Sequence, residues 1–385
     1  MPRSGRLEEI IMDAAALLRD LIALPSVNPA FLPAGHPWAG EQRVCDFLAA
    51  TAARLGLDLD FQVVESGRRN LLARLCPVGH VRHRVILAPH LDTVGASDNQ
   101  LTPRAARGRL YGRGACDTKG SIAAMLTALS RVAGSPRRPA ATEIVFAGLI
   151  DEEHGQIGSR FLARSGLEGD LAIVGEPTQL EVVTAHKGNV WMQLETRGKA
   201  AHGAHPDLGV NAVHDMARIV HLLETKHSSR LRRHAHPLLG CGTINIGVIA
   251  GGTQPNIVPD RCAIQIDRRT LPGENEMAVI GQVRSLLRQN RLRARVTSFK
   301  EAACPPLETN PRLPFVSRFL EAARQTRPAG VAFFCDAAVL AAAGIPSVVF
   351  GPGDIAQAHT EDEWISLRAL QRATDLLTRF LLSLP

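Results

Sequence analysis

The sequence predicts an α/β protein into which a second, smaller α+β domain is inserted. Towards both ends of the chain, short apolar runs alternate with amphipathic stretches, a pattern typical of a mainly parallel sheet flanked by helices. In the middle, apolar and polar residues alternate, which favours half-buried strands. At 385 residues the chain is also longer than one compact core normally serves.

The first expected domain consists of alternating helices and strands. Apolar residues recur at helical spacing over residues 7–22, 41–55, 121–132 and 159–165. Runs with strand character cover residues 59–64, 71–75, 85–88, 143–150, 171–174 and 347–350. Parallel strands present ligands at their carboxyl ends, so polar side chains that directly follow these runs are candidates for a functional site.

The inserted domain has its own succession of elements. Expected strands and helices cover, in order, residues 188–194, 210–223, 243–249, 257–266 and 274–287, where the second and last are helical. This order is typical of a small α+β unit. We therefore predict a first domain of residues 1–186 and 299–385 and an inserted domain of residues 187–298.

Composition excludes several classes of protein. The content of 45% hydrophobic and 21% charged residues is typical of a globular chain, and no apolar run is long enough to span a membrane. Seven scattered cysteines without a Cys-x-x-Cys pair indicate reduced thiols. The net charge of +7 is spread over arginine pairs, and only 4% of residues are aromatic. We expect a cytoplasmic protein that binds neither nucleic acid nor membrane.

The strand-like run 84–89 is followed by two side chains that could serve a metal site, His90 and Asp92. Along an extended backbone, residues i and i+2 project to the same side. A metal-binding imidazole usually donates its other N–H to a carboxylate, which is a role that suits Asp92. A structural histidine at a strand end is the alternative.

Two further acidic groups follow the same design. Asp117 stands in a glycine-rich loop before a helix, where a carboxylate could bridge two metal ions or simply cap the helix. The expected strand 143–150 ends in Asp151, Glu152 and Glu153. Three adjacent acids favour a cation that neutralises them, although a solvated turn is the alternative.

The last two candidates also lie just beyond apolar runs. Glu176 follows the expected strand 171–174 and precedes a proline, and His359 comes after the run 347–350 and a loop of glycine and proline. Both positions repeat the arrangement seen at His90.

Five motifs in this order resemble the M20 metallopeptidase family, which includes acetylornithine deacetylase, succinyl-diaminopimelate desuccinylase, aminoacylase-1 and carboxypeptidase G. They are His90-x-Asp92-Thr-Val, Gly112-Arg-Gly-x-x-Asp117-x-Lys-Gly, Asp151-Glu-Glu153, Gly175-Glu-Pro-Thr and Ala358-His359. The resemblance extends from about residue 10 to the C-terminus. It implies a zinc-exopeptidase-like catalytic domain with an inserted lid and dimerisation domain.

The resemblance also implies roles for these residues. His90 and Glu176 would hold one Zn²⁺ and Glu153 and His359 a second, with Asp117 between them. Co²⁺ or Mn²⁺ could substitute, because the ligand set is nitrogen and oxygen. Glu152 would be the general base, and Asp92 would orient His90.

Residues of the expected lid match the family as well. The resemblance implies that His202 stabilises the oxyanion, commonly from the partner subunit of a homodimer, with His205 as the competing choice. Asn256 and Arg269 would bind a substrate carboxylate, with Arg268 as the alternative to Arg269. Gly351 and Gly353 would form the carboxylate-side loop. Cys335 departs from the family pattern, which commonly has threonine before Asp336 and Ala337.

We therefore expect a dinuclear-zinc hydrolase that cleaves the amide bond of N-acyl amino acids, in the style of a deacetylase or desuccinylase. A dipeptidase or carboxypeptidase is the alternative enzyme, because a peptide is also an N-acyl amino acid. A catalytically silent protein that binds amino-acid derivatives is the alternative outside enzymes.

Overall fold

The computed structural model describes residues 12–299 and 304–385, which form two compact units. The first unit contains the chain up to Thr184 together with Thr309–Ala329 and Cys335–Pro385. The second unit contains Ala185–Glu308 and the short return Gly330–Phe334, which the sequence analysis did not separate from its surroundings. Residues 7–11 of the first predicted helix lie outside the described residues.

The large sheet contains a parallel centre. Its strand order is β1-β2-β6-β3-β7-β17-β8-β15, with β16 beside β8. β6, β3, β7 and β17 are parallel to one another, whereas the strands at both ends of the sheet join antiparallel. The bounds are β1 Asp58–Glu65, β2 Arg68–Leu75, β3 His83–Pro89, β6 Thr142–Gly148, β7 Leu171–Gly175, β8 Val183–His186, β15 Leu307–Glu308, β16 Ala329–Val331 and β17 Ser347–Val349.

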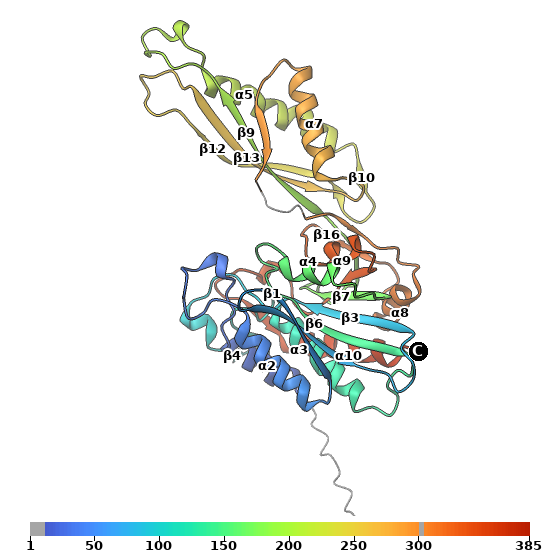
Figure 1. Ribbon diagram of the computed structural model, residues 1–385. Coiled ribbons are helices and arrows are strands. Elements are labelled where there is room, and N and C mark those ends of the chain that lie inside the picture. Colours follow the sequence, from blue (N-terminus) through green and yellow to red (C-terminus); the bar gives the residue numbers. More distant parts are fainter. Residues whose placement is uncertain (1–11, 300–303) are drawn as a thin grey trace, which may run out of the picture. The chain divides into compact units, whose positions relative to one another are not determined.

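Helices cover both faces of this sheet (Figure 1). One face carries the main apolar core together with α1 Ala14–Ala23, α2 Gln42–Arg54, α3 Lys119–Ala133, α8 Pro314–Ala323 and α10 Leu367–Leu382. The other face carries α4 Ile157–Arg164 and α9 Ala337–Ala342. The predicted α/β fold is therefore confirmed. No helix among the described residues combines the length and apolar character that crossing a bilayer requires.

A small antiparallel sheet joins distant parts of the first unit. Its strands are β4 Arg104–Ala106, β5 Arg109–Tyr111 and β18 Trp364–Ser366. Trp364 pairs with Tyr111, so the segment that follows His359 lies beside the start of the glycine-rich loop. The sequence analysis did not predict this sheet, because each strand is only three residues long.

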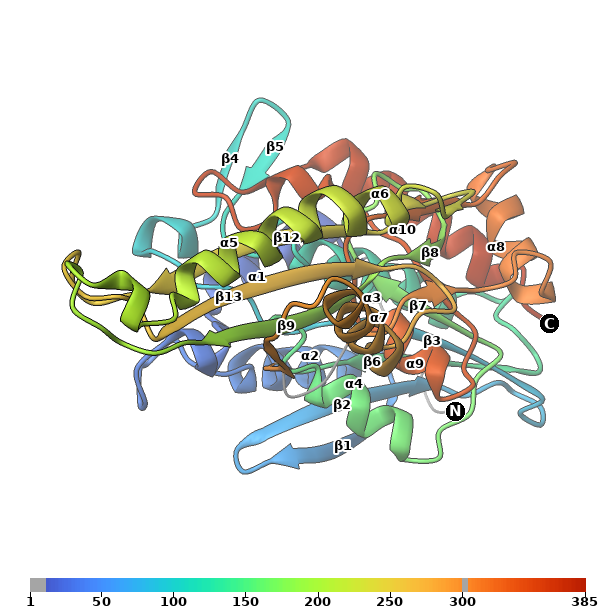
Figure 2. The same ribbon diagram turned by 90° about the horizontal axis from the view of Figure 1, so that it is seen from above.

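The second unit is a four-stranded antiparallel sheet covered by two helices. The strand order is β12 Thr243–Gly251, β13 Arg261–Thr270, β9 Gly188–Arg197 and β14 Arg295–Ser298. The helices α5 Ala212–Leu222 and α7 Glu276–Gln289 share one apolar cluster with these strands, and Figure 2 shows α5 running along the long strands. Shorter elements are β10 Ala235–His236, β11 Gly240–Cys241 and α6 Ser228–Leu231.

One predicted strand boundary is wrong. We expected a strand over residues 257–266, but β13 covers Arg261–Thr270. Residues 257–258 pair instead with the segment around His202, where Val258 donates its backbone N–H to Ala201. Pro259 then interrupts the pairing because it has no N–H to donate.

Candidate metal centre

The candidate centre lies at the carboxyl edge of the parallel strands. β3 pairs in parallel with both β6 and β7. His90 follows β3, residues 151–153 follow β6, and Glu176 follows β7. Because parallel neighbours end at the same edge of a sheet, these side chains converge.

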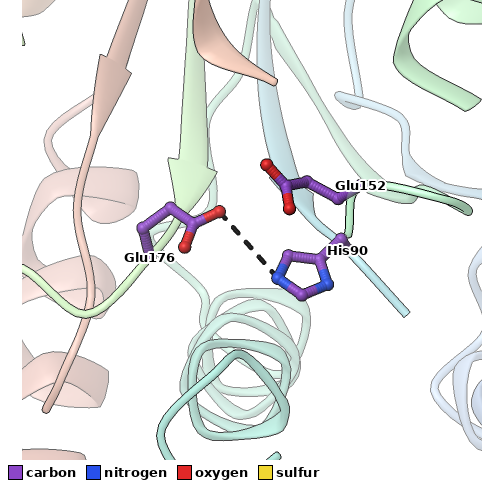
Figure 3. Close-up of side chains that lie close together, drawn as sticks. All are labelled: His90, Glu152 and Glu176. Carbon is purple, nitrogen blue, oxygen red and sulfur yellow. Dashed lines mark ion pairs between the residues drawn. The ribbon is translucent and has the colours of Figure 1, made fainter. Parts of the chain in front are cut away.

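His90 is buried among carboxyl groups. Its Nε2 lies 3.0 Å from Asp117 Oδ1 and 3.9 Å from Glu176 Oε1, and its Nδ1 lies 3.0 Å from the carbonyl oxygen of Asp92. Figure 3 shows Glu176 and Glu152 facing the imidazole from two sides. Burial alone would lower the pKa of His90, but hydrogen bonds with Asp117 and Asp92 raise it well above its usual value.

Asp117 lies between the two predicted histidine ligands. Its Oδ1 is 3.0 Å from His90 Nε2 and its Oδ2 is 3.3 Å from His359 Nε2. His359 also lies 3.1 Å from Glu153 Oε2. Hydrogen bonds with Asp117 and Glu153 raise the pKa of His359 to about 10. Each oxygen of the Asp117 carboxylate therefore faces a different half of the site.

Three glutamates crowd the same space. Burial and the charge of Glu176 raise the pKa of Glu152 well above its usual value, and burial with the charge of Asp117 does the same for Glu176. Burial and Asp117 also raise the pKa of Glu153. A divalent cation would relieve this repulsion, because it stabilises the ionised form of every carboxyl group around it.

The donor set fits metal ions. Potential ligand atoms of His90, Glu152 and Glu176 lie within 4.8 Å of one another, and so do those of His90, Asp117 and Glu153. Oε1 of Glu153 and Oε1 of Glu176 are buried without a hydrogen-bond partner among the described residues. Buried carboxylate oxygens normally have partners, so these two atoms are suited to coordination. Glu152, which we predicted as the base rather than a ligand, is thus part of one of these groups.

The carboxylate of Asp92, which we predicted to orient His90, accepts hydrogen bonds from the turn that follows β6. Its Oδ1 accepts a hydrogen bond of 3.0 Å from the backbone N–H of Glu152, and its Oδ2 accepts one of 3.1 Å from that of Glu153. The Nδ1 of His90 is 3.5 Å from the Asp92 carboxylate, farther than from the Asp92 carbonyl oxygen. Asp92 therefore fixes the turn that carries both glutamates.

Asn28 is a site residue that the sequence analysis missed. It is fully buried, and its Nδ2 donates to Asp92 Oδ2 at 2.8 Å and to Asp151 Oδ1 at 2.9 Å. Asp151 has a φ of 68°, so the turn contains a backbone strain that these contacts help to hold. Asn-Pro pairs are common in ordinary turns, and no pattern in the sequence around Asn28 distinguishes it from an asparagine without a role in a site.

The loop glycines Gly351 and Gly353 pack beside the segment that carries Glu176. A Cβ atom on Gly351 would lie 2.5 Å from the carbonyl oxygen of Glu176, which is closer than such contacts allow. Gly353 has a φ of 96°, and a Cβ there would lie 2.5 Å from Cys116 Sγ. These glycines allow close packing next to Glu176.

Cys335, where the chain departs from the family pattern, and the neighbouring Asp336 are both buried in the first unit. Asp336 accepts a hydrogen bond of 2.6 Å from Ser159 Oγ, and burial raises its pKa to about 6. Burial and the charge of Glu176 raise the pKa of Cys335 well above its usual value. The thiol is therefore protonated near neutral pH.

His202 and Asn256, two residues of the predicted lid, are neighbours within the second unit. His202 is exposed and forms an isolated bridge with Ile257, and Gly203 donates its N–H to the carbonyl oxygen of Asn256 at 2.7 Å. His205 is also exposed and donates its backbone N–H to the carbonyl oxygen of His202. The structure thus brings His202 and Asn256 together.

The two adjacent arginines of β13 have different environments. Arg268 is buried, forms an ion pair of 2.6 Å with Glu274, and contacts the carbonyl oxygen of Arg269. Arg269 is half-buried and forms a 3.0 Å ion pair with Asp267. Since the guanidinium of Arg268 is already engaged inside the unit, Arg269 is the more accessible of the two.

Comparisons with known proteins agree with one another. Residues 86–383 match the sequence profile of Peptidase family M20/M25/M40. An acetylornithine deacetylase from Myxococcus xanthus is 35% identical over 324 residues, which cover 80% of this chain and 82% of the relative. The structure of aminopeptidase PepT from Bacillus cereus aligns with a TM-score of 0.78 at 23% identity and covers 97% of this chain and 99% of its own.

A Bacillus subtilis structure described as a dinuclear metal binding peptidase from the M20 family has the same fold. It aligns with a TM-score of 0.70 at 14% identity and covers 96% of both chains.

Proposed function

Because the chain belongs to peptidase family M20/M25/M40 and is a metal-dependent hydrolase, we propose that it cleaves the amide bond of N-acyl amino acids. The products would be a carboxylate and a free amino acid. The observation that carries the proposal is the cluster of two histidines and several carboxylates in which Asp117 lies between His90 and His359. The acetylornithine deacetylase relative supports an acyl amino acid rather than a long peptide.

The cofactor in this proposal is two Zn²⁺ ions per chain. His90 and Glu176 would hold one ion, and Glu153 and His359 would hold the other. Asp117 would be a ligand of both ions. The nitrogen and oxygen donors support zinc, and Co²⁺ or Mn²⁺ could take its place. Support for a dinuclear site also comes from the Bacillus subtilis structure, which is described as binding two metals.

Bound zinc would polarise the substrate carbonyl and lower the pKa of the attacking water. Glu152 then takes a proton from that water and passes it to the amide nitrogen as the carbon–nitrogen bond breaks. Burial and the charge of Glu176 raise the pKa of Glu152 above its usual value, and a carboxylate with a raised pKa is a stronger base, which supports this role.

Three side chains of the second unit contact the substrate in this proposal. His202 would donate to the oxyanion, and Asn256 with Arg269 would bind the substrate carboxylate through a bidentate guanidinium. The engagement of Arg268 with Glu274 supports Arg269 as the carboxylate ligand. Gly351 and Gly353 would line the carboxylate-side loop of the first unit.

A homodimer is also part of the proposal. The outer strand β12 has Val248 and Ile249 at 49% and 60% exposure, and Leu208 and Val210, in the segment before α5, are exposed as well. Adjacent exposed apolar side chains on an outer strand, as at Val248 and Ile249, support contact with a second copy of the chain. All seven cysteines are free thiols, which supports a cytoplasmic location.

The test combines metal analysis with a panel of acetyl, succinyl and aminoacyl amino acids. About two zinc ions per chain and chelator-sensitive release of amino acid would support the proposal, and the best panel member would identify the acyl group. Preference for aminoacyl substrates would favour the dipeptidase or carboxypeptidase alternative. Protein without metal and without turnover after zinc is added back would favour the silent binding protein.

A further inference from the structure

The carboxylate of Glu363 is buried against the loop that carries Asp117. Glu363 is 2% exposed. Its Oε1 accepts hydrogen bonds from the backbone N–H groups of Cys116 and Asp117, at 2.8 and 3.0 Å. Its Oε2 accepts one from the backbone N–H of Gly114 at 3.0 Å and one from the guanidinium of Arg113 at 2.8 Å. One carboxylate therefore satisfies three backbone N–H groups of a single short loop.

This arrangement holds the loop in one conformation. Gly114 has a φ of 81°. The backbone N–H groups of Cys116 and Asp117 donate to the Glu363 carboxylate and not to the carbonyl oxygens of a helix or strand. Burying an N–H group without a hydrogen-bond partner destabilises the folded state, so the loop needs an acceptor at this place. Because one of the donors is the N–H of Asp117 itself, Glu363 bears directly on where the Asp117 carboxylate points.

Glu363 also connects that loop to the segment of His359. It stands four residues after His359, and its backbone carbonyl accepts the N–H of Gly112 at 3.0 Å. Between the two residues, the carbonyl oxygens of Thr360 and Glu361 accept hydrogen bonds from Gln100 Nε2 at 3.2 and 2.9 Å. Glu363, together with Gln100, therefore joins the segment of His359 to the loop of Asp117.

We propose that Glu363 is a positioning residue that presets Asp117 and His359 to share a metal ion. The inference rests on the proposed function, because it assumes that these two side chains are ligands. Residues that orient metal ligands typically contribute 10–100-fold to metal affinity. Glutamine cannot replace Glu363, because its NH₂ group would face N–H donors and leave at least one of them without an acceptor.

The test measures zinc affinity by competition with a chromogenic chelator, in wild-type protein and in Glu363→Gln. We expect binding of the weaker zinc ion to fall by about 10–100-fold in the variant. The matched control is Glu361→Gln, because Glu361 is an exposed acid on the same segment and should leave zinc affinity unchanged. Thermal unfolding of the zinc-free proteins, together with kcat and KM at saturating zinc, separates a local effect from general destabilisation.

Three outcomes decide the proposal. Wild-type zinc affinity in Glu363→Gln would overturn it, and so would a loss that is fully accounted for by unfolding of the variant. If Glu363→Gln does not fold, Glu363→Asp keeps the ion pair with Arg113 but shortens the side chain, and it should also weaken zinc binding. Wild-type affinity in that variant would overturn the proposal as well. Failure of the proposed metal centre is a different result, since wild-type protein would then bind no zinc.

Discussion

Removing the side chain of Asn28 should destabilise the first unit even without metal. Asn28→Ala removes two hydrogen bonds to charged acceptors, Asp92 and Asp151. Hydrogen bonds to charged groups contribute about 1.5–3 kcal/mol each. Both carboxylates keep other donors. Asp92 still accepts two backbone N–H groups, and Asp151 still accepts the guanidinium of Arg68, so the lower end of the range applies. We expect a loss of about 3 kcal/mol in the free energy of unfolding.

The assay is urea unfolding of chelator-treated protein, because bound metal would add its own stabilisation. Asn99→Ala is the matched control, since Asn99 is exposed and its side chain has no hydrogen bond among the described residues. A loss below about 1 kcal/mol for Asn28→Ala would refute the reasoning, because it would equal that of an ordinary neutral hydrogen bond. A similar loss in both variants would refute it too.

Three further predictions follow from the site and the second unit. Glu152→Ala should abolish turnover and leave about two zinc ions per chain by metal analysis; loss of one ion would instead make Glu152 a ligand, as its closeness to His90 and Glu176 allows. His202→Ala should lower kcat by roughly one hundredfold with little change in KM, the effect expected for losing an oxyanion donor, and a change confined to KM would contradict that role. Burial lowers the pKa of His186 in the folded state to about 4. Between pH 6.5, the usual pKa of a histidine, and pH 4, His186 therefore binds a proton in the unfolded chain but not in the folded one. Stability should therefore fall from pH 6.5 towards pH 4 by up to about 1.4 kcal/mol per pH unit, and unfolding at several pH values should show a smaller slope in His186→Gln. An unchanged slope in that variant would contradict the assignment to His186.

The strands that build the centre could be predicted because each is a continuous apolar run. β3 and β6 each begin with two polar residues, but the rest of both strands and all of β7 are buried and lack polar side chains, so the polar residues that follow stand out. The small sheet of β4, β5 and β18 could not be predicted in this way. Its strands are too short to show a period, and their pairing joins residues more than 250 positions apart.

The sequence by itself determined which chemical groups meet at the centre. His90, the acids at 151–153 and Glu176 stand directly after buried strands, and the geometry of parallel sheets brings such positions to one edge. Only the tertiary structure decided how the groups are oriented and supported. Asp117 lies between His90 and His359, Asn28 joins Asp92 to Asp151, and Glu363 collects the N–H groups of the Asp117 loop. These contacts depend on strand order and side-chain packing between distant segments, which leave no periodic or local pattern in the chain.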